Sequence, residues 1–228
     1  MAQSKRFQKI AKLVDPAKAY KPADAIALAK QTAKTKFDGS IELHIRLGID
    51  PKKGEQQVRG AVTLPSGTGK TKTIAAFVSE GKEKEAKDAG ADVVGGAELI
   101  DRIKQSGATN FEVAVATPDM MPKLAGIARI LGPKGLMPSP KNETITTDLK
   151  KTIKELKGGK INFKNDDTGN LHQIIGKASF TADQLLANYT ALMEGILRAK
   201  PASAKGTFLK SVSVNATMGP GIAVDTAA

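Results

Sequence analysis

The first clear pattern along the chain is the alternation of apolar and polar residues in SIELHIRLGID, residues 40–50. Apolar side chains at every second position predict a strand with one buried and one wet face. VRGAVTL, residues 58–64, follows the turn-like DPKKGEQQ, so we expect these two strands to pair with each other in antiparallel fashion. Residues 5–14 and 24–34 have the spacing of short amphipathic helices, and Pro22 lies just ahead of the second.

From residue 67 the pattern changes to short apolar strands in alternation with helices. We expect strands at TIAAFVS, ADVVGG and FEVAVATP, and helices over residues 80–89, 97–105, 119–125 and 147–156. Continuous apolar strands joined by helical crossovers are typical of a parallel sheet covered by helices. This middle region is therefore predicted to be α/β.

Beyond Gly159 the alternating pattern returns, in INFKN and LHQIIGKASF around the turn NDDTGN, in a helix over residues 181–200 and in a last strand, TFLKSVSVNAT. We predict a two-lobe protein of mixed α/β and α+β class. Residues 1–66 and 160–228 form a discontinuous α+β lobe with an antiparallel sheet, and residues 67–159 form an inserted, Rossmann-like α/β lobe with a mostly parallel sheet. Glycines near both crossings suit a two-stranded hinge. The alternative, two domains in series, leaves each domain short of core.

LGPKGLMPSPK, residues 131–141, is predicted to be an ordered loop. Its three prolines fix φ and its two glycines allow positive φ, so neither a helix nor a strand accommodates it. Leu136 and Met137 distinguish it from a polar linker. Two interpretations stay open: a rigid connection whose apolar pair fills a core, and a binding loop.

Composition restricts the chemistry. The 228 residues are 40% hydrophobic, and 35 Lys and Arg against 23 Asp and Glu give a net charge of +12. Such a balance favours a polyanionic partner, with nucleic acid and a membrane surface in competition. The absence of cysteine and the presence of two histidines exclude thiolate catalysis and leave little for a metal site. The apolar runs are too short to span a membrane and the first residues lack a secretion signal, so we expect an intracellular, soluble protein without metal or cofactor.

The positive charge is unevenly spread. Residues 1–66 carry 13 basic and 6 acidic side chains, residues 67–159 carry 15 and 12, and residues 160–228 carry 7 and 5. The discontinuous lobe therefore holds +9 of the +12 and is the better candidate for a nucleic-acid site. Lys5, Arg6, Lys9 and Lys12 recur at helical spacing, as phosphate contacts or as an ordinary solvated helix face.

Motifs that suggest catalysis are weak. PSGTGKTKT ends like a nucleotide-binding P-loop, but Leu64 stands where the first glycine is required, and the segment precedes a strand instead of following one. His44 and His172 have no evident catalytic or metal partner. Asp166-Asp167 in NDDTGN is more typical of a hairpin turn than of an acid–base pair. We expect no catalytic residue and no enzyme; the alternative is a nucleotide-dependent enzyme that uses GTGKT.

Two segments suit contact with RNA. Lys36-Phe37 lies at the start of the Ile41 strand. At such a strand edge an aromatic ring could stack on a base or sugar while the ammonium meets phosphate. TMGPG, residues 217–221, ends the last strand, and its glycines allow the backbone to approach another surface closely. The structural alternatives are a core phenylalanine and a simple turn.

Four segments resemble the bacterial L-one family of ribosomal large-subunit stalk proteins: GIDPKKGEQQVRGAVTLPSGTGKT, LGPKGLMPSPK, FKNDDTGNLHQIIGK and AKGTFLKSVSVNATMGPG. The resemblance covers nearly the whole chain and implies a two-lobe fold with the α/β lobe inserted. It implies that the protein is located on the ribosome in the cytoplasm. Its implied partners are the large-subunit ribosomal RNA of the mobile stalk, exit-site transfer RNA and other ribosomal components. It also implies help in releasing deacylated transfer RNA, and repression of the protein's own operon by binding a similar messenger RNA structure.

Carried over position by position, the resemblance implies an RNA-contact surface of Lys36, Phe37, Ser40, Glu42, Asp166, Ser211, Thr217, Met218 and Gly219. These residues would press a small, dry patch onto the RNA minor groove and its 2′-hydroxyls. Candidate secondary RNA contacts are Lys5, Arg6, Lys9, Lys134 and Lys141. Asp167 stands where many members of the family carry lysine, which weighs against a phosphate contact from that turn. His172 matches the family without an assigned role.

Overall fold

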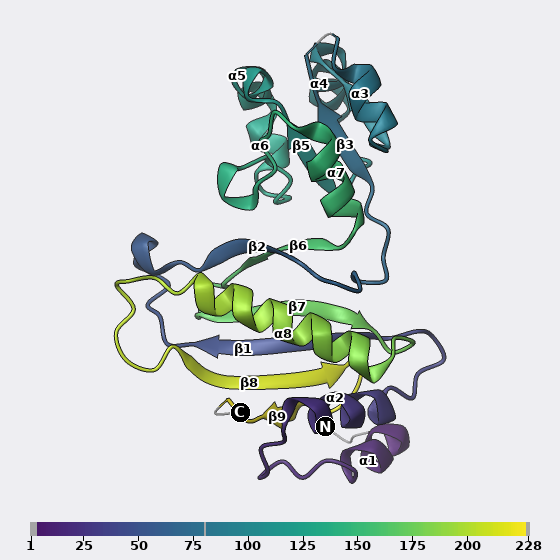
Figure 1. The fold of residues 1–228 in the computed structure, drawn as a ribbon, viewed down its shortest axis with the longest axis vertical. Coiled ribbons are helices and arrows are strands. Elements are labelled where there is room, and N and C mark those ends of the chain that lie inside the picture. Colours follow the sequence, from purple (N-terminus) through teal and green to yellow (C-terminus); the bar gives the residue numbers. More distant parts are fainter. Residues whose placement is uncertain (1–3, 80, 227–228) are drawn as a thin grey trace. The chain divides into compact units, whose positions relative to one another are not determined.

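A computed structural model of the chain describes residues 4–79 and 81–226, with the side chain of Lys141 outside the described part. The chain divides into two compact units (Figure 1). Unit 1 combines Met1–Gly69 with Ile161–Ala228, and unit 2 is Lys70–Lys160. The sequence predicts the crossings after residues 66 and 159.

Unit 1 is built on a four-stranded antiparallel sheet in the order β7-β1-β8-β9. The strands are β1 (Ser40–Leu47), β7 (Asn170–Lys177), β8 (Leu209–Ala216) and β9 (Ile222–Val224). A separate two-stranded ribbon joins β2 (Arg59–Thr63) to β6 (Lys160–Lys164). β9 is not predicted by the sequence pattern, because Pro220-Gly221 interrupts the apolar residues immediately before it.

The expected pairing of residues 40–50 with residues 58–64 is wrong. β1 pairs with β7 and β8, while β2 pairs with β6. Strands adjacent in sequence are usually neighbours, but burial decides here. β1 alternates buried and half-exposed residues and needs partners with a matching buried face, which β7 and β8 supply. None of the five residues of β2 is fully buried, so this strand does not extend that face.

Two helices cover one face of the unit 1 sheet, and α8 runs along it in Figure 1. α2 (Pro22–Thr32) has proline in its first turn, and α8 (Ala182–Arg198) begins with a capping box between Thr181 and Gln184. The unit also contains α1 (Lys5–Ala11) and the 3₁₀ turn η1 (Gly54–Gln56). α1 ends three residues earlier than the pattern predicts.

The core of unit 1 lies between these helices and the sheet. Leu43 and Ile45 of β1 are buried against Ile26 of α2 and Leu185 of α8. Each such side chain contributes about 1.5–3 kcal/mol through burial. Because the odd-numbered residues of β1 point into this core, its even-numbered residues Glu42, His44 and Arg46 lie on the opposite face, which these helices do not cover.

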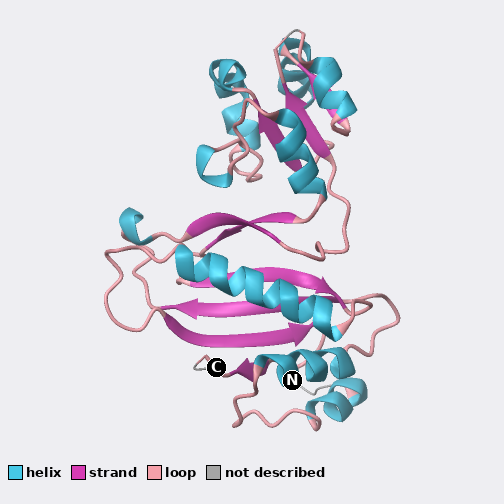
Figure 2. Ribbon diagram, in the orientation of Figure 1, coloured by secondary structure: helices cyan, strands magenta, loops and turns pink. Residues whose placement is uncertain are grey.

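Unit 2 is a three-stranded parallel sheet in the order β4-β3-β5, covered by helices (Figure 2). Apolar clusters lie on both of its faces: Phe77 belongs to one and Ile74 to the other. The strands are β3 (Ile74–Phe77), β4 (Val93–Gly95) and β5 (Val113–Ala116). The helices are α3 (Glu83–Asp88), α4 (Ala97–Ser106), α5 (Met121–Leu124), α6 (Ala128–Leu131) and α7 (Leu149–Lys157), with 3₁₀ turns η2 (Pro118–Met120), η3 (Ala125–Ile127) and η4 (Pro140–Asn142).

The predicted fold class is confirmed, since an antiparallel α+β unit accompanies a parallel α/β unit. Two helix predictions differ in detail. The helix predicted from residue 80 is α3 from Glu83, and residue 80 itself lies outside the described residues. The single helix predicted over residues 119–125 is instead a broken run of short α and 3₁₀ turns from Pro118 to Leu131, in which Pro122 removes a backbone donor.

The loop at residues 131–141 leaves α6 through turns and enters η4. Leu136 and Met137 are half-buried and pack on the cluster that contains Phe77. Gly135 has φ 69°, in the left-handed region that glycine tolerates. The loop is therefore a packed connection whose apolar pair fills the edge of a core.

Candidate nucleic-acid interface

Two loops of unit 1 lie side by side at one end of the sheet: loop A, residues 33–39 before β1, and loop B, residues 217–221 after β8. Antiparallel pairing sets Ile41 opposite Ala216 and so brings the loops together. Thr217 joins them through three hydrogen bonds. Its amide donates to the carbonyl of Ser40 at 2.9 Å, and its hydroxyl accepts from the amide of Ser40 at 2.9 Å and donates to the same carbonyl at 3.1 Å.

Each loop carries an exposed hydrophobic side chain. Phe37 is 59% exposed and Met218 64%, and they are two of the four large hydrophobic residues that are exposed in the described part of the chain. The hydroxyl of Thr35 donates to the carbonyl of Phe37 at 2.7 Å and shapes loop A. Met218 has φ 64°, a conformation that bulky residues rarely adopt. A strained, exposed methionine on one loop and an exposed phenylalanine on the adjoining loop are typical of a binding surface.

Small residues shape the backbone around this pair. A Cβ on Gly219 would lie 3.0 Å from the carbonyl oxygen of Ala216 and 3.4 Å from the hydroxyl of Thr32, tighter than a side chain normally tolerates. Ser40 is only 8% exposed, and its hydroxyl oxygen accepts from the ammonium of Lys177 at 3.2 Å. Ser40 and Gly219 therefore support the surface, whereas Lys36 is exposed on it.

The uncovered face of the sheet continues from the loops and is polar. His44 of β1 lies directly opposite His172 of β7, and their Nδ1 atoms are 2.8 Å apart. His44 Nε2 lies 2.9 Å from the side-chain oxygen of Asn215, which only accepts, so this nitrogen carries the proton. The two Nδ1 atoms share one hydrogen bond, in which one imidazole donates and the other accepts. Glu42 lies beside this network, 3.8 Å from His44 Nε2.

From the sequence alone His44 and His172 are ordinary polar strand residues, and no motif marks Asn215. The alternation in SIELHIRLGID places His44 on the wet face of its strand. The contact among these three residues depends on which strands pair and in which register, and neither could be deduced from local pattern.

The far end of this face is formed by Ser211 and Asp166. Ser211 is opposite Arg46 in the β1–β8 pairing and lines a shallow hollow of about 270 Å³ with His44 and His172. Asp166 lies in the turn between β6 and β7. Ser40 and Arg46 are six residues apart on β1, so the surface from loop A to this hollow spans about 20 Å.

Asp166 organises its turn. Its carboxylate accepts from the amide of Asn170 at 2.7 Å and from the amide and hydroxyl of Thr168 at 2.9 Å. The hydrogen bond from the Asn170 amide, helped by those from Thr168, lowers the pKa of Asp166 to about 2. Gly169 follows with φ 81°. The turn predicted from NDDTGN is present, and the Asp166 carboxylate is engaged within it.

The candidate secondary contacts fall into two groups. Lys5 and Lys9 are exposed on α1 of unit 1, whereas the Arg6 guanidinium donates to the carbonyls of Lys34 and Met218. In unit 2, the ammonium of Lys134 donates to the hydroxyl of Thr109 at 2.9 Å and to the carbonyl of Gly107 at 3.4 Å. Lys141 lies in η4, and its side chain is outside the described part. The nine primary candidates thus lie in unit 1, and Lys134 and Lys141 do not.

Other features do not form a chemical site. GTGKT contains two glycines with φ 66° and 73° and leads into β3, so it is a connection rather than a phosphate-binding turn before a helix. In residues 4–79 and 81–226, no group of three or more acidic or histidine side chains is placed to hold a metal ion. No helix of this part combines the length and apolar character needed to cross a membrane.

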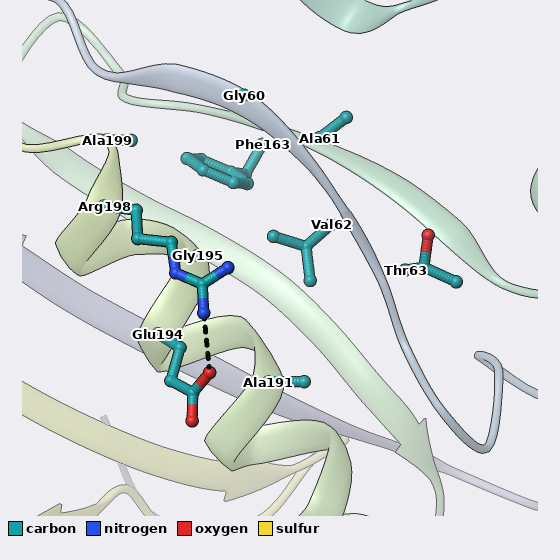
Figure 3. A pocket seen from close by; sticks show the side chains of 10 residues that line it. All are labelled: Gly60, Ala61, Val62, Thr63, Phe163, Ala191, Glu194, Gly195, Arg198 and Ala199. Carbon is teal, nitrogen blue, oxygen red and sulfur yellow. Dashed lines mark hydrogen bonds and ion pairs between the residues drawn. The ribbon is translucent and has the colours of Figure 1, made fainter.

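A hollow of about 470 Å³ lies between β2, β6 and α8 (Figure 3). Val62 packs closely on Gly195, and the ring of Phe163 lies beneath Gly60. Its charged groups, Arg198 and Glu194, pair with each other at 3.3 Å. The residues that line the hollow therefore include no unpaired cluster of positive charge that could attract a polyanion.

An exposed apolar pair framed by polar groups, on the more basic part of the chain, defines a binding protein rather than a catalyst. The chain belongs to the ribosomal protein L1p/L10e family, whose sequence profile matches residues 29–220. Its similarity extends over almost the whole chain to the large ribosomal subunit protein uL1 of Saccharopolyspora erythraea, at 53% identity over 223 residues, 98% of this chain and 93% of that protein. The uL1 proteins of Frankia alni and Corynebacterium glutamicum are each 52% identical, over 225 and 223 residues, and 94% of each is covered.

Family membership fixes the broad role. The chain is a ribosomal protein with a structural rather than an enzymatic function, and its place is the ribosome in the cytoplasm. The nucleotide-dependent enzyme considered from GTGKT is thereby excluded.

Proposed function

We propose that unit 1 binds a folded segment of large-subunit ribosomal RNA through loops A and B and the uncovered face of its sheet. The observation that carries this proposal is the exposure of Phe37 and Met218 on two loops joined by Thr217 and Ser40. A surplus of +9 over residues 1–66 and 160–228 supports it, since RNA is a polyanion. The relatives named as large ribosomal subunit proteins support the choice of RNA.

The chemistry of the surface suits shape recognition. The minor groove of an RNA helix is wide and shallow, so a flat patch can press against riboses and 2′-hydroxyls. Phe37 and Met218 exclude water there, and neighbouring polar groups then form hydrogen bonds protected from solvent. Lys36 and the exposed lysines of α1 add an attraction to phosphates that weakens with salt.

Filter binding with a ribosomal stalk RNA fragment tests the proposal. Met218→Asp places a carboxylate in the apolar patch and is expected to weaken binding at least tenfold. Leu197→Asp is the matched control, since Leu197 is an exposed hydrophobic residue on α8 and outside the two loops. Equal affinity of the Met218→Asp variant and the wild type would remove Met218 from the interface.

Footprinting on ribosomal RNA tests the partner itself. Wild-type protein is expected to protect one compact segment of large-subunit RNA. Residues 1–66 joined by a short linker to residues 160–228 are expected to protect the same segment. If residues 67–159 alone give that footprint, the interface belongs to unit 2 and the proposal is wrong.

We further propose two roles that rest on the family resemblance: assistance to the release of deacylated transfer RNA at the exit side, and repression of the protein's own operon. A surface that reads shape can bind any RNA with the same fold, including a messenger RNA segment. Addition of the protein to a translation reaction programmed with its operon messenger is expected to lower synthesis, and the Met218→Asp variant should not. For the first role, ribosomes depleted of the protein should release deacylated transfer RNA more slowly until it is added back.

A further inference from the structure

Arg6 links the two loops of the interface from a third element. Its guanidinium Nη1 donates to the carbonyl of Lys34 at 3.3 Å, and Nη2 donates to the carbonyl of Met218 at 3.2 Å. The first acceptor lies in loop A and the second in loop B, 184 residues apart in the chain. One planar group with two parallel donors therefore bridges the loops that carry Phe37 and Met218.

The helix that carries Arg6 is capped at its start and buried near its end. Ser4 caps the start of α1, and its hydroxyl accepts from the amide of Phe7 at 3.2 Å. Ile10 is buried at its end and Val14 just beyond it. The side chain of Arg6 therefore extends to both loops from a capped helix whose C-terminal end is buried.

Loop B needs such support. Met218 adopts a left-handed backbone conformation, which a methionine keeps only where the surroundings impose it. The residues on either side of Met218 are held by hydrogen bonds, Thr217 to Ser40 and Gly219 to Ala216. The carbonyl of Met218 itself is held by Arg6.

We propose that Arg6 is a positioning residue of the RNA interface: it sets the spacing and orientation of Phe37 and Met218 by holding loops A and B together. The inference rests on the function proposed above. It replaces the expectation that Arg6 is a simple phosphate contact, because two of its donors are already committed to backbone carbonyls. Lysine is a poor replacement, since all the donors of its ammonium sit on one atom, whereas the planar guanidinium presents two separate nitrogens to the two carbonyls.

Substitution of Arg6 by lysine and by glutamine distinguishes a positioning role from a phosphate contact. A phosphate contact survives Arg6→Lys and is lost in Arg6→Gln, with a decrease of about one in the salt dependence of binding. A positioning residue fails in both variants, and because no phosphate contact is lost, the slope of log affinity against log salt stays as in the wild type. Lys5→Gln and Lys9→Gln, at exposed lysines of the same helix, are the comparison: each removes an attraction to phosphate and is expected to lower the salt slope, which the Arg6 variants should not.

Filter binding over a salt series is the experiment. Arg6→Lys and Arg6→Gln are each expected to weaken binding to the stalk RNA fragment about tenfold, with the wild-type salt slope. Wild-type affinity of Arg6→Lys together with a reduced slope in Arg6→Gln would make Arg6 a phosphate contact and overturn the proposal. Thermal unfolding of each variant verifies that it is folded at the assay temperature.

Hydrogen exchange of the free protein gives a second readout that needs no RNA. The amide of Gly219 in loop B donates to the carbonyl of Ala216, the last residue of β8. It is expected to exchange several-fold faster in Arg6→Lys than in the wild type, while amides of β1 stay unchanged. Unchanged exchange at Gly219 overturns the positioning role even if RNA affinity falls. If the wild type binds no stalk RNA but Gly219 still exchanges faster in Arg6→Lys, the proposed RNA function fails and the link between the loops stands.

Discussion

The hydroxyl of Thr217 satisfies both backbone polar groups of Ser40: it accepts from the amide at 2.9 Å and donates to the carbonyl at 3.1 Å. Ser40 is the first residue of β1, and Thr217 directly follows the last residue of β8. A side chain therefore continues the strand pairing past the end of the sheet, and the loops that carry Phe37 and Met218 start from a fixed base.

Thr217→Val tests this relationship. Valine keeps the shape of the side chain but leaves the amide of Ser40 without its acceptor, so we expect a loss of about 1–3 kcal/mol in the free energy of unfolding. RNA affinity should fall as well, because loop B loses its anchor. Urea denaturation and filter binding measure the two effects. Thr190→Val on α8 is the control, expected to change stability by less than about 0.5 kcal/mol, since that hydroxyl bonds only within its own helix.

Substitution of Met218 by glycine is expected to raise the stability of the fold but to weaken RNA binding. Met218→Gly relieves the left-handed conformation and should raise the free energy of unfolding by up to about 1 kcal/mol. It removes the exposed side chain and should weaken RNA binding. Met218→Ala removes the same side chain but retains the strain, so it should bind as weakly without gaining stability. A Met218→Gly variant no more stable than Met218→Ala would show that the conformation at this position stores no strain.

The elements of the fold were largely predictable because their signals are local. Alternation marked β1, β7 and β8, and the apolar strands of the middle region marked β3 and β5. The partners of β1 were not predictable, because pairing depends on which distant strand offers a matching buried face. β2 is nearer in sequence, but lacks that face.

The candidate site was accessible by resemblance more than by pattern. Phe37 looks like a core residue in sequence, and only its 59% exposure distinguishes it from one. The bridge from Arg6 to loops A and B and the contact between His44 and His172 join segments far apart in the chain. Local periodicity contains no information about such contacts, so they appear only once the sheet is assembled.

Lys160 is expected to stabilise unit 2 through two carboxylates. Its side chain is 6% exposed, and its ammonium donates to Glu143 at 2.5 Å and to Glu155 at 2.8 Å. Burial lowers the pKa of Lys160, but the bonds to Glu143 and Glu155 outweigh it, so the pKa is raised above 10.5. The folded unit therefore holds this proton more tightly than the unfolded chain. The stabilisation is complete below pH 10.5 and is lost as the pH rises through the folded value.

Lys160→Met should reduce the free energy of unfolding of unit 2 by roughly 1–2 kcal/mol, because the freed carboxylates can reach water. Urea denaturation followed by hydrogen exchange within residues 70–160 measures it in the full chain. Lys157→Met is the control: its pair with Asp92, at 3.4 Å, is solvent-exposed and should contribute less than about 0.5 kcal/mol. Equal effects of the two substitutions would contradict a special role for the buried ammonium.

Asp166 is expected to make unit 1 sensitive to acid. The hydrogen bond from the Asn170 amide, with those from Thr168, lowers the pKa of Asp166 from 3.8 to about 2. The folded state therefore favours the ionised carboxylate. Its contribution is present above about pH 4 and is lost as the pH falls toward 2. Since this side chain is 40% exposed, we expect the contribution to be modest, roughly 0.5–1 kcal/mol.

Asp166→Asn removes the titrating group and retains one acceptor oxygen. Its melting temperature at pH 7 should lie slightly below that of the wild type, and the difference should shrink between pH 4 and 2 as the wild type loses its own contribution. Thermal melts at half-unit pH steps measure this. Asp167→Asn is the control, because the neighbouring side chain is exposed and its variant should parallel the wild type at every pH. A difference between Asp166→Asn and the wild type that stays constant down to pH 2 would mean that the carboxylate charge does not hold the turn.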